Sequence, residues 1–266
     1  MEFKRIILRF YFFLNNQLGI DPFKIFYFIY GIPRYLHDLF LFKGQYSGKM
    51  KFHPCLHDWQ EEGGATKDEY FLQDLVVARK IFKADPEKHV DIGSRVDGFV
   101  AHVASFRSIE VFDVRPVTTK IPGVVFKQAD FMKPLKSSIK EKNYYCDSLS
   151  CLHALEHFGL GRYGDPVAVD GFIHGFANMS ALLKPDGIFY LSVPLGISRV
   201  EFNANRIFDP FVIVQLALEN SLKVSELIII KQGGIIDSGF DKAKLSQIAC
   251  QQYSLGIFTF IKQEKK

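Results

Sequence analysis

The sequence predicts an α/β protein in which helices cover both faces of a mostly parallel sheet. Two observations support this class. From residue 68 onward, strand-like hydrophobic runs alternate with segments of helical periodicity, as they do in chains that form parallel sheets. Polar residues suited to ligand binding follow directly after several of these runs, and ligands bind at that edge of such sheets. We therefore expect the functional site at the carboxyl ends of the strands.

Composition excludes several function classes. The 266 residues suffice for one well-buried domain with an accessory segment, and the hydrophobic share of 48% is typical of a globular protein. The 33 basic and 29 acidic residues are interspersed, so no basic stripe for nucleic acid is evident and we expect no nucleic-acid partner. Four cysteines without a C-x-x-C pair indicate free thiols and a cytoplasmic protein.

Residues 1–43 form a predicted helical segment that is unusually aromatic. They hold thirteen of the 39 aromatic residues and carry a net charge of +3. Arg9 interrupts a signal-peptide pattern, and the charged residues leave no uncharged apolar run long enough for a spanning helix. Three interpretations remain open: a cap on the core, a homodimer face, or a peripheral contact with the inner face of a membrane.

Residues 44–67 are predicted to form an irregular linker or lid, because glycines and a proline punctuate a polar stretch. The main domain is expected to span residues 68–266. It begins with a helix for which Asp68 is a suitable N-cap. Seven strands are predicted, at "KHVDI", "SIEVFDV", "GVVFKQAD", "YYCDSLSCL", "GIFYLSVPL", "VSELIII" and "SLGIFTFIK".

The turns after the first three strands carry a pattern typical of an adenosine-containing cofactor. Gly93, in "DIGSRVDG", permits a tight turn that lets a ligand approach the backbone. Asp113 follows the second strand, twenty residues beyond Gly93, which is the usual spacing for a carboxylate that binds ribose hydroxyls. Asp130 and Phe131 follow the third strand, where an acid and an aromatic ring suit an adenine.

Two further segments resemble class I S-adenosylmethionine-dependent methyltransferases, a family with a Rossmann-like fold. "LKPDGIFYLSVP" resembles the segment leading through their fifth strand, and "CDSLSCLHALEHF" resembles their fourth strand. The resemblance implies S-adenosylmethionine as cofactor, with Asp91, Gly93 and Ser94 at its methionine part. It also implies Asp113 at the ribose and Asp130 with Phe131 at the adenine. Arg95 is a further candidate in the turn and departs from the family's glycine-rich pattern there.

Within that superfamily, the runs "DIGSRVDGFVAHVASF", "SCLHALEHFGLGRYGDP" and "LSVPLGISRVEFNANR" resemble a bacterial and nematode family of unknown function. Its members are associated with glycan and surface-polysaccharide biosynthesis. The resemblance implies methyl transfer to a hydroxyl or carboxylate of a sugar or nucleotide-sugar acceptor. Two alternatives stay open. One is a non-catalytic protein of polysaccharide assembly, and the other is an NAD-dependent oxidoreductase.

The segment "HALEH" supplies the main catalytic candidates, His153, Glu156 and His157. Either histidine could act as a base near neutral pH. The three could instead hold a divalent metal, because they resemble the E-x-x-E-H metal motif of some class I enzymes, with His153 in place of the first glutamate. A zinc-peptidase helix is disfavoured, since three glycines follow within seven residues of His157.

Two polar loops complete the candidate site. The first, "GLGRYGDP", carries Arg162, Tyr163 and Asp165 and could close on a polar acceptor. The second, "GISRVEFNANR", contains Arg199 and Glu201 among arginines and amides that suit a sugar or a nucleotide-linked sugar.

Overall fold

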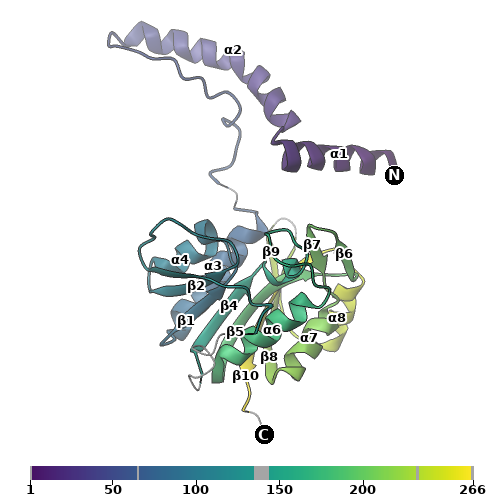
Figure 1. The fold of residues 1–266 in the computed structure, drawn as a ribbon. Coiled ribbons are helices and arrows are strands. Elements are labelled where there is room, and N and C mark those ends of the chain that lie inside the picture. Colours follow the sequence, from purple (N-terminus) through teal and green to yellow (C-terminus); the bar gives the residue numbers. More distant parts are fainter. Residues whose placement is uncertain (1, 65, 135–143, 232–233, 265–266) are drawn as a thin grey trace. The chain divides into compact units, whose positions relative to one another are not determined.

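The computed structural model describes residues 2–64, 66–134, 144–231 and 234–264. The chain divides into two compact units, Met1–Ala65 and Thr66–Lys266. Both units are drawn in Figure 1.

The first unit consists of two helices and an irregular segment, residues 46–64, which we call the return segment. Helix α1 spans Glu2–Leu18 and helix α2 spans Pro22–Gln45, with Asp21 as the N-cap of α2. The return segment packs tightly on α2, because a Cβ atom added at Gly31 would lie 2.1 Å from the carbonyl oxygen of Leu56. Among the described residues, no helix is long and apolar enough to cross a membrane.

The second unit is built on one mixed sheet whose strands run in the order β3-β2-β1-β4-β5-β10-β8-β9. The strands are β1 His89–Ile92, β2 Ile109–Asp113, β3 Val124–Gln128, β4 Cys146–Leu152, β5 Leu183–Leu195, β8 Leu222–Lys231, β9 Ile235–Ser238 and β10 Ser254–Lys262. Neighbours from β3 to β5 pair in parallel, whereas β10 pairs antiparallel with β5 and β8.

The predicted fold class is confirmed, but the predicted strand count of seven was wrong. The sheet has eight strands, because β9 adds an edge strand antiparallel to β8. This strand has only four residues and lies between two glycines, so it lacks the length that marks a strand in sequence. A separate two-stranded hairpin, β6 Arg199–Glu201 and β7 Asn205–Ile207, occupies part of the predicted polar loop after β5.

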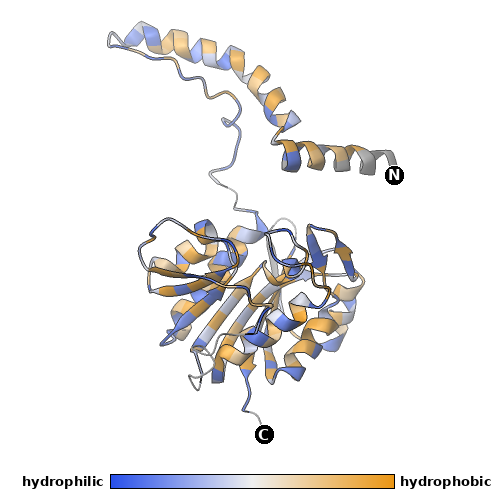
Figure 2. Cartoon of the chain, viewed as in Figure 1, coloured by the Kyte–Doolittle hydropathy of each residue, from blue (hydrophilic) through white to orange (hydrophobic). Residues whose placement is uncertain are grey.

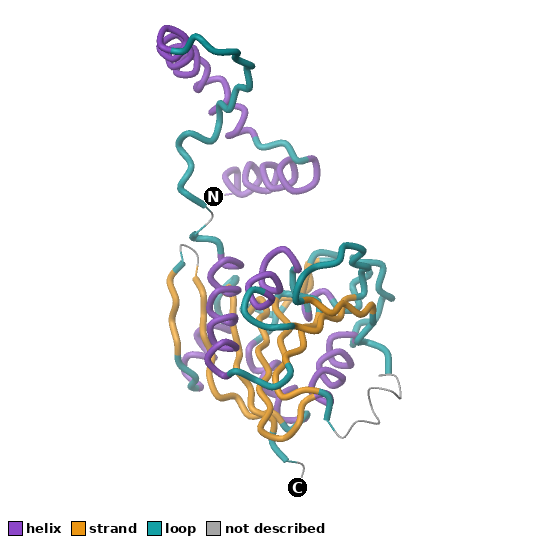
Figure 3. The backbone as a smooth tube through the Cα atoms, turned by 90° about the vertical axis from the view of Figure 1, so that its left-hand side faces the viewer, coloured by secondary structure: helices purple, strands orange, loops and turns teal. Residues whose placement is uncertain are grey.

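Helices cover both faces of the sheet, as Figures 1 and 3 show. On one face lie α3 Glu69–Ala84, η1 Val96–Val100 and α4 Ala101–Ala104; on the other lie α6 Gly171–Leu182, α7 Pro210–Glu219 and α8 Lys242–Ala249. Figure 2 shows the hydrophobic strands between these layers. Asp68 caps α3 as predicted, since its side chain accepts a hydrogen bond from the Tyr70 N–H.

Strand β4 occupies the middle of the parallel part, between β1 and β5. Its side chains are almost all buried, because both faces of a parallel sheet are covered. The loops that follow β1, β2, β3 and β4 therefore leave the sheet at the same edge. That edge is where the candidate residues of the sequence come together.

Leu149 is the side chain through which β4 supports the core. It is fully buried, so Leu149→Ala should lower the free energy of unfolding by about 3 kcal/mol through lost burial and a residual cavity. Leu218→Ala on α7 is the matched control, because that leucine is 63% exposed, and it should change stability by less than about 0.5 kcal/mol. Urea unfolding of the full chain measures both. Equal effects of the two substitutions would contradict the placement of β4.

Candidate functional site

A cavity of about 260 Å³ lies at the carboxyl ends of the parallel strands. Twelve of the predicted site residues line it: Gly93, Ser94, Arg95, Asp113, Asp130, Phe131, His153, Glu156, His157, Arg162, Tyr163 and Asp165. Three others, Asp91, Arg199 and Glu201, are not among its lining residues. The predicted cofactor and catalytic segments therefore share one cavity.

The turn after β1 is held close to the loop after β4. Gly93 has a φ of +74°, and a Cβ atom there would lie 2.9 Å from the Cβ of Ala154. Its N–H donates to the Phe112 carbonyl across a distance of 2.8 Å. A side chain at this position would be strained in its backbone and would also crowd Ala154. The glycine thus leaves the floor of the cavity open at the backbone.

Asp91 supports this turn from beneath. The Ser94 hydroxyl donates to Oδ1 of Asp91 at 2.6 Å, and the Ser150 hydroxyl donates to the same oxygen at 2.5 Å. The Ser94 N–H donates to Oδ2, while the Ser94 hydroxyl accepts from the Leu152 N–H. Complete burial raises the pKa of Asp91 to about 7, although these hydrogen bonds favour the carboxylate. Asp91 joins β1, the turn and β4 rather than facing the cavity.

Arg95 does not obstruct the turn. Its side chain is 63% exposed and pairs with Asp97, with the Nε and Nη2 atoms 3.1 and 2.8 Å from the carboxylate oxygens. The pairing lowers the pKa of Asp97 through a hydrogen bond, and it neutralises the charge that the sequence placed in this loop. Arg95 thus lines the cavity with its charge already paired to Asp97.

Asp113 ends β2 at the cavity wall and is only 7% exposed. The Arg115 guanidinium forms a bidentate pair with it, at 3.0 Å from Nε to Oδ1 and 2.6 Å from Nη2 to Oδ2. The same guanidinium lies over the Tyr163 ring, 4.5 Å from the ring centroid. Arg115 thus links the carboxylate predicted to bind ribose with the glycine-rich loop.

Asp130 and Phe131 follow β3. The Oδ1 atom of Asp130 accepts from the Met132 N–H, whereas the buried Oδ2 has no hydrogen-bond partner and lies 3.5 Å from Lys133 Nζ. Phe131 is buried against Phe112 in an edge-to-face contact. A buried carboxylate oxygen without a hydrogen bond is costly, so this atom is suited to accept one from a ligand.

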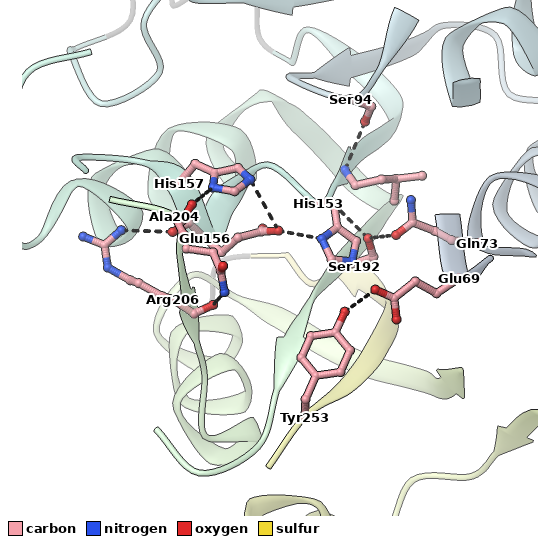
Figure 4. A network of polar contacts seen from close by, with 12 residues as sticks. Glu69, Gln73, Ser94, His153, Glu156, His157, Ser192, Ala204, Arg206 and Tyr253 are labelled. Carbon is pink, nitrogen blue, oxygen red and sulfur yellow. Dashed lines mark hydrogen bonds and ion pairs between the residues drawn. The ribbon is translucent and has the colours of Figure 1, made fainter. Parts of the chain in front are cut away.

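His153, Glu156 and His157 form a polar cluster after β4 (Figure 4). Nδ1 of His153 donates to Oε1 of Glu156 at 2.7 Å, and Nε2 of His157 lies 3.9 Å from the same oxygen. Nδ1 of His157 lies 2.7 Å from the Ala204 carbonyl oxygen. A carbonyl only accepts, so Nδ1 of His157 must carry the proton and Nε2 keeps a lone pair when the ring is neutral.

The two histidines titrate in opposite directions. Burial alone would lower the pKa of His153, but the charge of Glu156 and the hydrogen bond to it raise that pKa above the ordinary histidine value. Burial lowers the pKa of His157, and the neighbouring Glu156 offsets this only in part. His157 is therefore the neutral imidazole of the pair at neutral pH, while His153 favours its charged form beside Glu156.

The structure does not support the metal prediction for His153, Glu156 and His157. Across residues 2–64, 66–134, 144–231 and 234–264, no group of three His, Cys, Asp or Glu side chains is arranged to hold an ion. One reason is that Nδ1 of His153 and Oε1 of Glu156 are bonded to each other. A zinc-peptidase helix is also absent from this segment. His153 has a φ of +50°, and only the single 3₁₀ turn η2 Leu155–His157 follows.

Asp165 organises the glycine-rich loop rather than pointing a free carboxylate at a ligand. Its oxygens accept from the N–H groups of Gly159, Gly161 and Tyr163. Arg162 donates to the Ala204 carbonyl at 3.0 Å and lies beside the Tyr163 ring. The loop thus packs on the β6–β7 hairpin beside the polar cluster of His153, Glu156 and His157.

Arg206 fastens the same loop from β7, a role that the sequence did not indicate. It is 6% exposed and donates to the carbonyl oxygens of Glu156, Phe158 and Val169. Arg199 and Glu201 pair with each other on the exposed hairpin, 2.9 Å apart. The predicted arginine cluster therefore divides into a buried structural residue and a surface ion pair.

The cavity is also lined by polar residues that were not predicted from the sequence, among them Tyr70, Gln73, Asp74 and Tyr253. Three belong to α3, in which Gln73 and Asp74 are buried although they are polar. The Tyr70 ring lies 4.6 Å from the His153 ring between centroids, at a tilt of 45°, and burial raises the pKa of the Tyr70 hydroxyl to about 12. Polar residues within the apolar face of "EYFLQDL" were the available signal.

Comparisons with known proteins agree with this architecture. Residues 117–219 match a family described as "Caenorhabditis protein of unknown function, DUF268". No curated protein matches the chain. The solved structure of the N-methyltransferase NodS from Bradyrhizobium japonicum WM9 is similar, with a TM-score of 0.50 and 12% identity over 76% of this chain and 99% of that chain.

Two further solved structures are similar at slightly lower scores. NodS in complex with S-adenosylhomocysteine has a TM-score of 0.49 and 13% identity, over 77% of this chain and 92% of that chain. The 1,6-didemethyltoxoflavin-N1-methyltransferase from Burkholderia thailandensis has a TM-score of 0.48 and 14% identity, over 74% and 80%. The fold of residues 66–266 is thus the Rossmann-like fold of class I methyltransferases, extended by one edge strand.

The raised pKa of Asp91 predicts a pH-dependent stability. Between the ordinary value of 3.8 and about 7, the unfolded chain releases the Asp91 proton while the folded protein retains it. Stability from this group therefore falls as pH rises through that window and is constant above it. Asp91→Asn removes the titration. Urea unfolding should show wild-type protein losing stability relative to the variant from about pH 4 to about pH 7. If the difference in unfolding free energy between wild-type protein and Asp91→Asn does not change with pH, the raised pKa of Asp91 is contradicted.

Proposed function

We propose that this protein transfers a methyl group from S-adenosylmethionine to a hydroxyl oxygen of its acceptor. The observation that carries the proposal is the single cavity in which the Gly93 turn, the strand-end carboxylates and the neutral His157 meet. The similarity to methyltransferases supports the fold on which the proposal rests.

The cavity residues fit the cofactor on their own geometry. The carboxylate of Asp113 would hold the ribose hydroxyls, and Oδ2 of Asp130 would accept from the adenine amino group, because it has no other hydrogen bond. Phe131 would contact the adenine ring. The Gly93–Ser94 turn would receive the methionine part, since both residues line the cavity and Gly93 places no side chain there.

The cofactor would supply a methyl carbon made electrophilic by an adjacent sulfonium. A hydroxyl acceptor must lose its proton as it attacks, so a base within reach is required. His157 meets that requirement because its lowered pKa keeps the imidazole neutral and its Nδ1–H is fixed by Ala204. Its Nε2 would take the proton, and Glu156, 3.9 Å away, would stabilise the resulting imidazolium.

His153 serves a positioning role in this scheme. Its hydrogen bond orients the Glu156 carboxylate, and its main-chain N–H donates to the Ser192 hydroxyl at 3.0 Å. The Tyr70 ring covers its imidazole. These contacts hold Glu156 in a position where it is fully buried, so the charge of the carboxylate would act on His157 at low local dielectric.

We further propose that the acceptor is a sugar or a nucleotide-linked sugar. The resemblance of three segments to a family associated with glycan biosynthesis supports this choice. Arg162 and Asn205 add polar groups to the cavity wall, as a polyhydroxylated acceptor requires. Incubation with methyl-labelled S-adenosylmethionine and a panel of nucleotide sugars, followed by mass spectrometry, tests it. Label that appears only on amines would refute the hydroxyl assignment.

Cofactor binding should depend on Asp113. We expect the wild-type protein to bind S-adenosylhomocysteine and Asp113→Asn to bind it about 10- to 100-fold more weakly, because a charge-assisted hydrogen bond to the ribose is weakened. Asp170→Asn is the matched control, since Asp170 is exposed and pairs with His174. Isothermal calorimetry measures all three. If the folded wild-type protein does not bind S-adenosylhomocysteine, the proposed function is wrong. If the wild type binds it and Asp113→Asn binds it as tightly as Asp170→Asn does, the assignment of Asp113 to the ribose is wrong.

The state of His157 can be measured without knowing the acceptor. In nitrogen-15 NMR of the imidazole rings, His157 should be the neutral Nδ1–H tautomer at pH 7 and should titrate below the ordinary histidine value. His157→Asn assigns the signal, and exposed His174 is the internal control. Once an acceptor is known, His157→Asn should lower kcat about 10²- to 10⁴-fold while S-adenosylhomocysteine affinity is retained. A charged ring at pH 7 would exclude His157 as the base.

A further inference from the structure

The first unit carries an unusual share of exposed apolar side chains. The described residues have 36 large hydrophobic side chains that are exposed, and 19 of them lie in the first 65 residues. The helices α1 and α2 hold most of these, including eight phenylalanines. Figure 2 shows hydrophobic residues in orange along α2, interrupted by hydrophilic residues in blue. Such a surface normally contacts an apolar partner.

One stripe of α2 is already covered within the unit. Tyr27, Gly31, Tyr35 and Leu39 recur every four residues and are less exposed than their neighbours. The return segment accounts for this, because the Leu56 carbonyl fits against Gly31. Trp59 stacks on Tyr30, and the guanidinium of Arg34 lies 4.5 Å from the Trp59 ring centroid. The return segment thus defines an inner side of the helix.

A second stripe of α2 has no such cover. Its members follow the spacing of one helix face and are Ile25, Ile29, Ile32, Leu36 and Phe40, with exposed fractions of 38 to 78%. With about 100° of rotation per residue, Arg34 and Asp38 lie on the opposite side of the helix, where they form an ion pair at 3.5 Å. The helix is therefore amphipathic, with its charged side toward the return segment.

Charge distinguishes the same region. Residues 1–51 hold eight Lys or Arg and three Asp or Glu, which gives +5, whereas the whole chain is +4. Residues 52–266 therefore carry 25 basic and 26 acidic residues, or −1. The excess positive charge of the chain thus coincides with its exposed aromatic helices. An apolar protein partner would require only the hydrophobic stripe, but an anionic lipid surface requires both features.

We propose that residues 2–46 bind the surface of an anionic membrane, with the exposed stripe of α2 buried at the boundary between headgroups and acyl chains. The helices lie in the plane of that surface, since neither is long and apolar enough to span it. The basic residues of the segment contact lipid phosphates and carboxylates. This inference is independent of the proposed catalytic function. It adds a location for the protein.

Vesicle flotation of the full-length protein tests the proposal. The protein should float with vesicles of phosphatidylcholine and phosphatidylglycerol, and much less with phosphatidylcholine alone or at high salt. Ile29→Ser, Leu36→Ser and Phe40→Ser combined should lower partitioning at least about tenfold. All three sites are exposed, so the substitutions leave the packed side of α2 intact.

The matched control replaces three equally exposed apolar residues of the second unit, Leu218, Val125 and Phe202, with serine. This variant should float like the wild type. Far-ultraviolet circular dichroism and urea unfolding of each variant check that the protein is folded. Absence of flotation with anionic vesicles overturns the proposal, as does equal flotation of both triple variants. If light scattering instead shows a dimer that the α2 variant dissociates and no vesicle binding, a second copy covers the stripe and the proposal is wrong.

Discussion

The candidate site depends on the buried carboxylate of Asp91. Its two oxygens accept from both the main chain and the side chain of Ser94 and from Ser150, so one group joins the turn after β1 to strand β4. Ser94 extends the connection to the Leu152 N–H, directly before His153. The position of the segment from His153 to His157 relative to the glycine turn is thus set by buried hydrogen bonds. Because the carboxylate has no exposed surface, each of these donors is needed to offset its desolvation.

Two nearby histidines differ in how far burial is offset by the carboxylate of Glu156. Burial would lower the pKa of His153, but the charge of Glu156 and its direct hydrogen bond raise that pKa above the ordinary histidine value. Burial lowers the pKa of His157, and the more distant Glu156 and the bond to the Ala204 carbonyl offset this only in part, so the two imidazoles differ in their affinity for a proton. In the described part of the chain, the His153 ring and the Glu156 carboxylate are bonded to each other and do not form a three-residue metal-ligand group with His157.

The sequence predicted the sheet and the cavity edge because both depend on local patterns. Strand-length hydrophobic runs identified seven strands, and the polar residues after them, such as Gly93, Asp113 and Asp130, do line one cavity. Long-range contacts were not predictable. The approach of Tyr70 to His153, the pairing of Arg115 with Asp113 and the burial of Arg206 under the loop each join segments whose spacing carries no signal. For Asp91, the sequence indicated its position at the end of a strand. It did not indicate that the side chain bonds to Ser94 and Ser150 rather than lining the cavity.

The two units differ in how far their apolar side chains are buried. The second unit, residues 66–266, buries its apolar residues between the sheet and two helical layers and carries 25 basic and 23 acidic residues, a net charge of +2. The first unit leaves most of its aromatic side chains exposed, and all of its Lys and Arg residues lie in residues 1–51 together with them. Helices with such a surface gain more free energy from an apolar interface than from water. An enzyme whose acceptor lies at a membrane would gain from this arrangement, because the catalytic unit is then held where its acceptor is concentrated.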